Sequence, residues 1–119
     1  MRVLVCGGRT YNDQERAFKE LDALRSRVRI LRDDIELVIE GGANGADRLA
    51  RYWALARGIP CMTIHACWDA YGKKAGHKRN EWMLRFGAPN LVLAFPGGTG
   101  TANMTTQARL AEVRVQEVE

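Results

Sequence analysis

Three glycine-rich segments carry the residues of this sequence that are best suited to hold a negatively charged group. They are Gly7-Gly8-Arg9-Thr10, Gly41-Gly42-Ala43-Asn44-Gly45-Ala46-Asp47 and Pro96-Gly97-Gly98-Thr99-Gly100-Thr101. Because glycine has no side chain, main-chain N–H groups in such segments approach a ligand closely. A helix that follows adds unpaired N–H donors and the positive end of its dipole, and a phosphate satisfies both. The hydroxyls of Thr99 and Thr101 would be further donors.

The third segment holds more glycine than a tight turn requires, whereas a pair such as Gly7-Gly8 alone is usually only a connection. Neither common phosphate motif is present. The sequence has no GxxxxGK[ST], and Asn103 stands where GxGxxG would place its third glycine.

Two carboxylates stand beside these segments. Glu40 precedes the second segment and is the best candidate for a catalytic acid, although an ion pair with an arginine is the competing interpretation. Asp47 begins a predicted helix, where it would bond loop amides or stabilise the helix N-terminus. As a ligand contact, Asp47 would accept a ribose hydroxyl, because a carboxylate repels phosphate.

The densest basic cluster lies near Trp68 and Tyr71 and includes Lys73 and Arg79. Aromatic rings next to cations can stack a base and hold its phosphate. Alternatively, Trp68 packs its loop onto the domain. The spacing of Trp53, Trp82 and Phe86 is helical and favours core or subunit contacts.

The sequence gives little support for a metal site or for a disulfide framework. His65 and His77 lack the helical His/Glu spacing of a zinc site, so we expect no metal and no cofactor. The three cysteines are an odd number without a CxxC pair, which favours a reducing cytoplasm over a disulfide framework. Cys6 and Cys61 lie in apolar strand segments and are predicted to be buried.

Strand-like and helical segments alternate along the chain, which is typical of βαβ units around a parallel sheet. Strands are predicted over Arg2–Cys6, Glu36–Ile39, Cys61–His65, Leu91–Phe95 and, at an edge, Val113–Val118. Helices are predicted from an Asn12/Glu15 capping box to about Leu31, and over Ala46–Arg57, His77–Phe86 and Ala102–Ala111. We expect one α/β domain, 1–119, a Rossmann-like three-layer sandwich with a mostly parallel sheet of about five strands and helices on both faces. The three glycine-rich segments should then meet at one edge.

The composition and charge of the chain limit the classes of protein to which it can belong. The 119 residues are 46% hydrophobic and 27% charged, which fits a globular domain. No apolar run approaches the ~20 residues of a membrane span, and the N-terminal apolar stretch is too short for a signal peptide. We therefore expect no membrane association and a cytoplasmic location. The net charge of +4 favours anionic partners without implying nucleic acid.

In combination, the motifs resemble the YspA-like branch of the SLOG superfamily, which is named for the DNA-processing protein Smf/DprA and for Lonely Guy. The resemblance covers about residues 2–115 and rests on Gly7-Gly8-Arg9, Glu40 to Asp47, Trp68 to Gly76, Arg79-Asn80 and Ala94 to Ala102. It implies a Rossmann-like fold, a nucleotide-derived ligand at the motif edge, and assembly as a homo-oligomer such as a dimer. The predicted ligand-binding residues are Gly7, Gly8, Arg9, Thr10, Gly41, Gly42, Ala43, Asn44, Gly45, Asp47, Trp68, Lys73, Arg79, Asn80, Pro96, Gly97, Gly98, Thr99, Gly100 and Thr101.

Three functions remain open. The favoured one is binding or sensing of a phosphate-bearing nucleotide or a derivative of the NAD or ADP-ribose type. The second is a Lonely Guy-like N-glycosidase, for which Arg79 matches the family's arginine. That family's glutamate after Gly-Thr is missing from Ala102, Asn103 and Met104, so Glu40 would have to replace it. The third, suggested by the basic cluster and less favoured, is single-stranded nucleic-acid binding.

Overall fold

The sheet has five parallel strands in the order β3-β2-β1-β4-β5, as seen in a computed structural model that describes all residues from Met1 to Glu119. The strands are β1 (Arg2–Cys6), β2 (Leu37–Glu40), β3 (Cys61–Thr63), β4 (Leu91–Ala94) and β5 (Arg114–Glu117). The helices are α1 (Gln14–Ile30), α2 (Ala46–Arg57), α3 (Trp68–Tyr71), α4 (Ala75–Gly87) and α5 (Thr99–Leu110), with a 3-10 turn, η1, at Gly72–Lys74.

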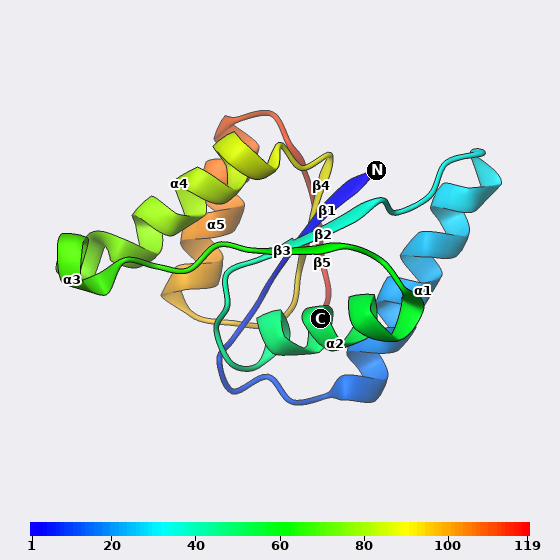
Figure 1. The fold of residues 1–119 in the computed structure, drawn as a ribbon, viewed down its shortest axis with the longest axis horizontal. Helices are drawn as coiled ribbons and strands as arrows, with labels where there is room; N and C mark the ends of the chain where they lie inside the picture. Colours follow the sequence, from blue (N-terminus) through cyan, green and yellow to red (C-terminus); the bar gives the residue numbers. More distant parts are fainter.

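Helices cover both faces of the sheet, which confirms the predicted three-layer α/β fold (Figure 1). Alternate residues of a strand point to opposite faces. Val3 and Val5 accordingly belong to the core beneath α1 and α2, whereas Leu4 and Cys6 belong to the core beneath α4 and α5. The central strands are apolar on both sides because neither face meets solvent.

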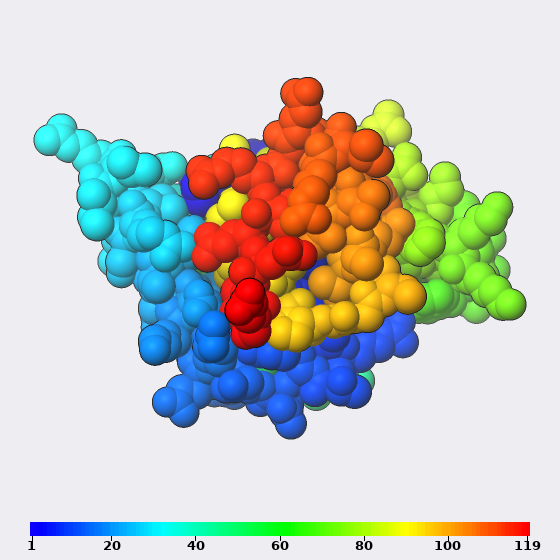
Figure 2. All heavy atoms as spheres, turned by 180° about the vertical axis from the view of Figure 1, so that it is seen from behind, coloured from blue at the N-terminus to red at the C-terminus, as the bar shows by residue number.

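The strand order reverses between β1 and β4. From β1 the chain moves outward through β2 to β3, and β4 returns to the other side of β1 before β5. Open α/β sheets bind ligands outside the carboxyl ends of the strands at such a point. Figure 2 shows β5 and the last residues on the surface between α1 and α5, and β5 pairs only with β4, as expected of an edge strand.

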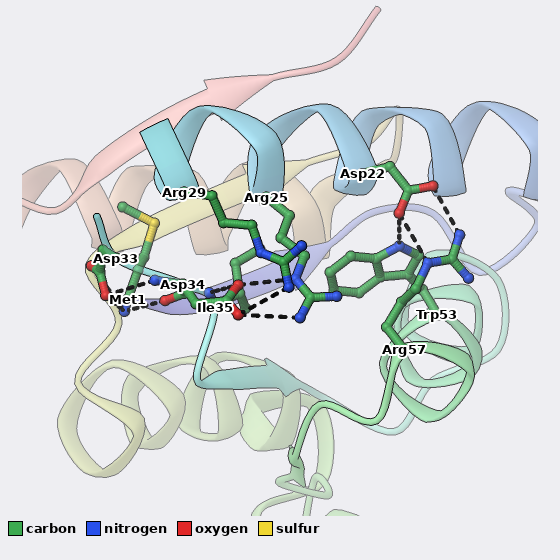
Figure 3. Close-up of polar contacts among 9 residues, drawn as sticks. All are labelled: Met1, Asp22, Arg25, Arg29, Asp33, Asp34, Ile35, Trp53 and Arg57. Atoms are coloured by element: carbon green, nitrogen blue, oxygen red, sulfur yellow. Dashed lines mark hydrogen bonds and ion pairs between the residues drawn. The ribbon is translucent and has the colours of Figure 1, made fainter. Parts of the chain in front are cut away.

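A polar cluster fixes α1 against α2 and the start of β2 (Figure 3). Asp22 accepts hydrogen bonds from Trp53 Nε1 at 2.9 Å and from Arg57 Nη2 at 2.8 Å. The Arg57 guanidinium holds the pKa of Asp22 below its usual range. At the other end of α1, Asp34 accepts from Arg25 Nε at 2.9 Å. These contacts lie away from the carboxyl edge of the sheet and serve the fold.

The predicted capping box of α1 is wrong. Asp13, one residue after Asn12, caps the helix by accepting from the N–H of Arg16 at 3.0 Å. The carbonyl of Asn12 instead accepts from the N–H of Gln14 at 3.0 Å, so the chain turns once more before the helix begins. Glu15 is the acidic residue of the first turn but makes no bond back to the cap.

The observed ends of several helices and strands also differ from the predicted ones. Helix α5 begins at Thr99, not at Ala102, so the threonines and Gly100 form its first turn. Helix α4 begins at Ala75, and α3 and η1 occupy a stretch that was expected to be a loop. β2 lies one residue later than expected, and β3 ends at Thr63 before it reaches His65. None of the helices combines the length and apolar character needed to cross a membrane.

The predicted burial of apolar residues is only partly right. Trp53 is fully buried and Cys6 is buried, as expected. Phe86 is 64% exposed on α4 and therefore does not belong to the core, so for this residue only the predicted alternative of a subunit contact stays open as a prediction. Trp82 and Cys61 are half-buried.

Candidate functional site

The three glycine-rich loops meet at Gly8. Its N–H donates to the carbonyl of Pro96 at 2.8 Å, which ties the loop after β1 to the loop after β4. Its carbonyl accepts from the N–H of Ala46 at 3.2 Å, which adds the start of α2. The predicted convergence is therefore confirmed, and Figure 1 shows all three connections at one edge of the sheet.

A cleft of about 800 Å³ opens at this edge. Most of the predicted ligand-binding residues line it: Gly7, Gly8, Arg9, Thr10, Ala43, Asp47, Trp68, Lys73, Arg79, Asn80, Pro96, Gly97, Gly98, Thr99, Gly100 and Thr101. Its size lies within the range of small-molecule pockets.

A second, smaller hollow of about 330 Å³ adjoins the cleft, and we call it the His65 hollow. Its lining consists of Arg9, Gly41, Gly42, Ala43, Asn44, His65, Ala66, Trp68 and Arg79. It shares Arg9, Ala43, Trp68 and Arg79 with the cleft. The predicted residues Gly41, Gly42 and Asn44 therefore lie here, whereas Gly45 and Glu40 line neither space.

Some glycines of the loops hold the loops together. A Cβ at Gly7 would lie 2.6 Å from the Cβ of Ala46. Gly45 has a φ of +76°, and a Cβ there would lie 2.1 Å from the carbonyl oxygen of Gly8. By contrast, a Cβ at Gly98 or Gly100 would meet nothing within 4 Å. The fold therefore does not require glycine at these two positions, which face open space.

The start of α5 presents unused hydrogen-bond donors. Ala102 is the first residue of this turn whose N–H makes a hydrogen bond, to the carbonyl of Gly98 at 3.0 Å. The N–H groups of residues 97–101 donate no hydrogen bond within the protein. They lie at the positive end of the helix dipole, on the cleft, where an anion would satisfy them.

Asp47 is the buried carboxylate of the cleft. It is only 6% exposed, and its Oδ2 accepts from the N–H groups of Gly41 at 3.1 Å and Ala43 at 3.2 Å. Burial raises the pKa of Asp47 to about 6, although the amide of Ala43 and the guanidinium of Arg79 oppose the shift. The predicted bonds to loop amides are present, and the carboxyl group titrates close to neutral pH.

Glu40 does not occupy the position that a catalytic acid would need. Its side chain is fully buried, and Oε1 accepts from Arg51 Nη1 at 3.2 Å and Thr63 Oγ1 at 3.1 Å. Oε2 accepts from the N–H of Gly42 at 2.9 Å. The competing interpretation, an ion pair with an arginine, describes this arrangement, because both oxygens bond protein groups beneath the loop.

Arg79 and Asn80 connect the loop after β2 to α5. Arg79 donates from Nη1 to the carbonyl of Gly41 at 2.5 Å and from Nε to Asn80 Oδ1 at 3.0 Å. Asn80, only 3% exposed, donates from Nδ2 to the carbonyl of Gly100 at 3.3 Å and to Asn103 Oδ1 at 3.1 Å. Burial lowers the pKa of Arg79 from a very high value, so the guanidinium remains a cation at the cleft.

Arg9 and Trp68 form one wall of the site. The Arg9 guanidinium lies 5.7 Å from the centroid of the Trp68 ring, in cation–π geometry. Trp68 is 51% exposed, so a large part of its ring is open to a guest. The wall borders both the cleft and the His65 hollow.

Eight residues of the cleft were not predicted from the sequence. They are Cys6, Tyr11, Asn12, Asp13, Gly76, His77, Met83 and Met104. The signal for Met83 and Met104 was their spacing, since each follows a predicted site residue by one helical turn, Asn80 and Thr101 respectively. Burial raises the pKa of Cys6 to about 12, which leaves the thiol unsuited to nucleophilic chemistry.

Comparisons with known proteins agree with this fold. A family model described as "YspA, cpYpsA-related SLOG family" matches residues 1–71. The Gene 61 protein of Mycobacterium phage D29 is 36% identical over 122 residues, covering 96% of this chain and 93% of that protein. The X-ray structure of DNA processing protein A (DprA) from Streptococcus pneumoniae is similar with a TM-score of 0.70 at 17% identity, which shows the fold alone. That match covers 99% of this chain and 50% of the other, so the chain spans about half the length of that structure's chain.

Proposed function

The chain belongs to the YspA, cpYpsA-related SLOG family, and from this membership we infer a nucleotide-related function: binding of a phosphate-bearing, nucleotide-like small molecule in the cleft. The observation that carries the proposal is the row of unpartnered N–H groups at residues 97–101, all of which line the cleft. A phosphate would accept from these groups and from the hydroxyl of Thr99.

The rest of the cleft supports the other parts of such a ligand. Asp47 would accept a ribose hydroxyl, because a carboxylate that is mostly ionised at pH 7 disfavours a second phosphate there. The ring of Trp68, backed by Arg9, would stack against a base. Arg79 lies among these groups and would neutralise the phosphate charge.

Native mass spectrometry of the purified protein tests the proposal directly. A co-purified mass that corresponds to a nucleotide or its derivative is the expected result, and the same spectrum gives the subunit number. The homodimer that the resemblance implies is part of this proposal. If no ligand co-purifies with the protein, binding is instead tested by titration with adenosine 5′-monophosphate. Binding that persists undiminished in Gly98→Val would overturn the placement of the phosphate.

A second candidate function, nucleotide N-glycosidase activity, is favoured by one observation. Asp47 places a carboxyl group with a pKa of about 6 in the cleft, near the Arg79 guanidinium that contributes to its electrostatics. Such a group can exchange a proton at neutral pH, which Asn103 cannot. Asp47 thus replaces Glu40 as the candidate acid.

Release of the free base from a nucleotide distinguishes the two functions. The protein would be incubated with nucleoside 5′-monophosphates and the products separated by chromatography. Base release that disappears in Asp47→Asn and in Arg79→Ala would support the enzyme. Binding without base release would support the sensor. Single-stranded nucleic-acid binding, in contrast, predicts an affinity that falls steeply with salt and grows with strand length.

A further inference from the structure

The His65 hollow differs from the cleft in its charge. Its lining contains the cationic groups Arg9 and Arg79 and the imidazole of His65, but no acidic side chain. The cleft, by comparison, contains Asp13 and Asp47. The only ionisable side chains that face the hollow therefore carry positive charge or acquire it on protonation.

The imidazole of His65 has its place because residue 42 is glycine. A Cβ at Gly42 would lie 2.5 Å from Nδ1 of His65 and 3.1 Å from Cγ2 of Thr63. The loop is fixed under the ring because the N–H of Gly42 donates to Glu40 Oε2 at 2.9 Å. His65 itself is exposed and lines the hollow.

The other polar groups of the hollow are also positioned as donors. The Oδ1 atom of Asn44 accepts from Arg48 Nη2, which orients the side-chain amide. Arg79 uses Nη1 and Nε to bond Gly41 and Asn80, and its Nη2 atom makes no hydrogen bond within the protein. The Arg9 guanidinium makes no hydrogen bond within the protein either, and it lies over the ring of Trp68.

We propose that the His65 hollow is a second anion-binding subsite, separated from the first at residues 97–101 by the shared residues Arg9, Ala43, Trp68 and Arg79. The anion is a phosphate or carboxylate bound by His65, Arg9 and the free Nη2 of Arg79. The volume of about 330 Å³ is larger than a phosphate or carboxylate group needs, so the hollow can also take neighbouring atoms of the ligand. Resting on the proposed function, this subsite extends it: the ligand carries two anionic groups, one in each space.

Inorganic phosphate is the probe that tests the subsite. Amide chemical shifts of the full chain would be followed during a phosphate titration, with sodium chloride matching the ionic strength. Two sets of amides should respond with separate binding curves, one around Asn44, His65 and Ala66 and one around residues 98–101. In His65→Gln, phosphate affinity at the first set should fall about tenfold, because the neutral amide of glutamine cannot make the charge-assisted hydrogen bond that a protonated imidazole makes to the anion. The matched control His77→Gln changes the other histidine, which lines only the cleft, and should leave that set unaffected.

The outcomes separate this proposal from the proposed function. Gly98→Val should abolish the response of residues 98–101 and leave the response near His65 intact. A response near His65 alone in the wild type would sustain the second subsite and count against the first. Absence of a response near His65 while residues 98–101 saturate would overturn the second subsite, as would an unchanged curve in His65→Gln.

Discussion

Asn80 donates its side-chain amide to Oδ1 of Asn103 at 3.1 Å, so the buried side chain of Asn80 and the half-buried side chain of Asn103 join α4 to the first turns of α5. The same amide bonds the carbonyl of Gly100, and the oxygen of Asn80 accepts from Arg79. Asn103 also accepts from Gln107 Nε2 at 2.8 Å. Asn103, in the stretch after the Gly-Thr pair where Lonely Guy-like enzymes carry their glutamate, thus holds an acceptor that orders the cleft.

Replacing Asn80 with alanine should weaken both stability and binding. The change removes the donor to Gly100 and Asn103 and the acceptor for Arg79 in a nearly solvent-free position. We expect the free energy of unfolding, measured by urea denaturation, to fall by about 1–3 kcal/mol. Glu81→Ala, on the exposed side of the same helix, is the control. Equal stability of the two variants would show that the network contributes nothing.

The glycines of the loops should divide into two classes on substitution. Gly98→Val should leave the free energy of unfolding nearly unchanged, because its side chain meets nothing and the φ of −101° suits any residue. It should abolish binding of adenosine 5′-monophosphate, because the side chain takes the phosphate's place, and Gly100→Val should do the same.

Gly7→Ala is the opposite case. Its methyl group would lie 2.6 Å from Cβ of Ala46 and 2.9 Å from Cβ of Phe95, so the strand and α2 would have to separate. We expect a loss of about 1–3 kcal/mol in urea denaturation. If Gly7→Ala were as stable as Gly98→Val, the division of the glycines would be wrong.

The cysteines should differ sharply in their reactivity. Cys67 is exposed, whereas burial raises the pKa of Cys6 to about 12 and that of Cys61 to about 11. A thiol reagent such as a chromogenic disulfide should modify Cys67 rapidly in the native protein and all three thiols after denaturation. Cys67→Ser should remove the rapid phase. A rapid phase that remains in this variant would show that Cys6 or Cys61 is accessible.

Much of the architecture could be predicted because alternation of strands and helices and the glycine loops are local signals. The range of α2 and the convergence at Gly8 follow from such patterns and from parallel-sheet geometry. The ion pair of Glu40 and the loop-amide bonds of Asp47 were among the predicted alternatives, but which of the two carboxyl groups would line the cleft could not be decided in advance. Both lie beside the same loop, and their different surroundings depend on Arg51, Thr63 and Arg79, which only the folded chain brings near.

The start of α5 was misplaced for a related reason. Gly98 and Gly100 disfavour a helix on local propensity, so the sequence predicted a loop as far as Thr101. In the fold, the carbonyl of Gly98 accepts from Ala102 and the carbonyl of Gly100 accepts from Asn80, which holds the turn in helical form. A tertiary contact here outweighs propensity, and it does so where the proposed phosphate binds.

Asp47 should make the stability of the protein depend on pH. Its pKa is about 6 in the folded state and 3.8 as the ordinary value, so the folded state binds more protons between these values. The free energy of unfolding should therefore fall as the pH rises from about 4 through about 6 and then level off, by at most about 3 kcal/mol from this group. Asp47→Asn keeps an acceptor for Gly41 and Ala43 but cannot ionise. The difference in stability between wild type and variant, measured by urea denaturation across this range, should shift in favour of the variant as the pH rises. Parallel curves would mean that Asp47 titrates in the folded protein as it does in the unfolded chain.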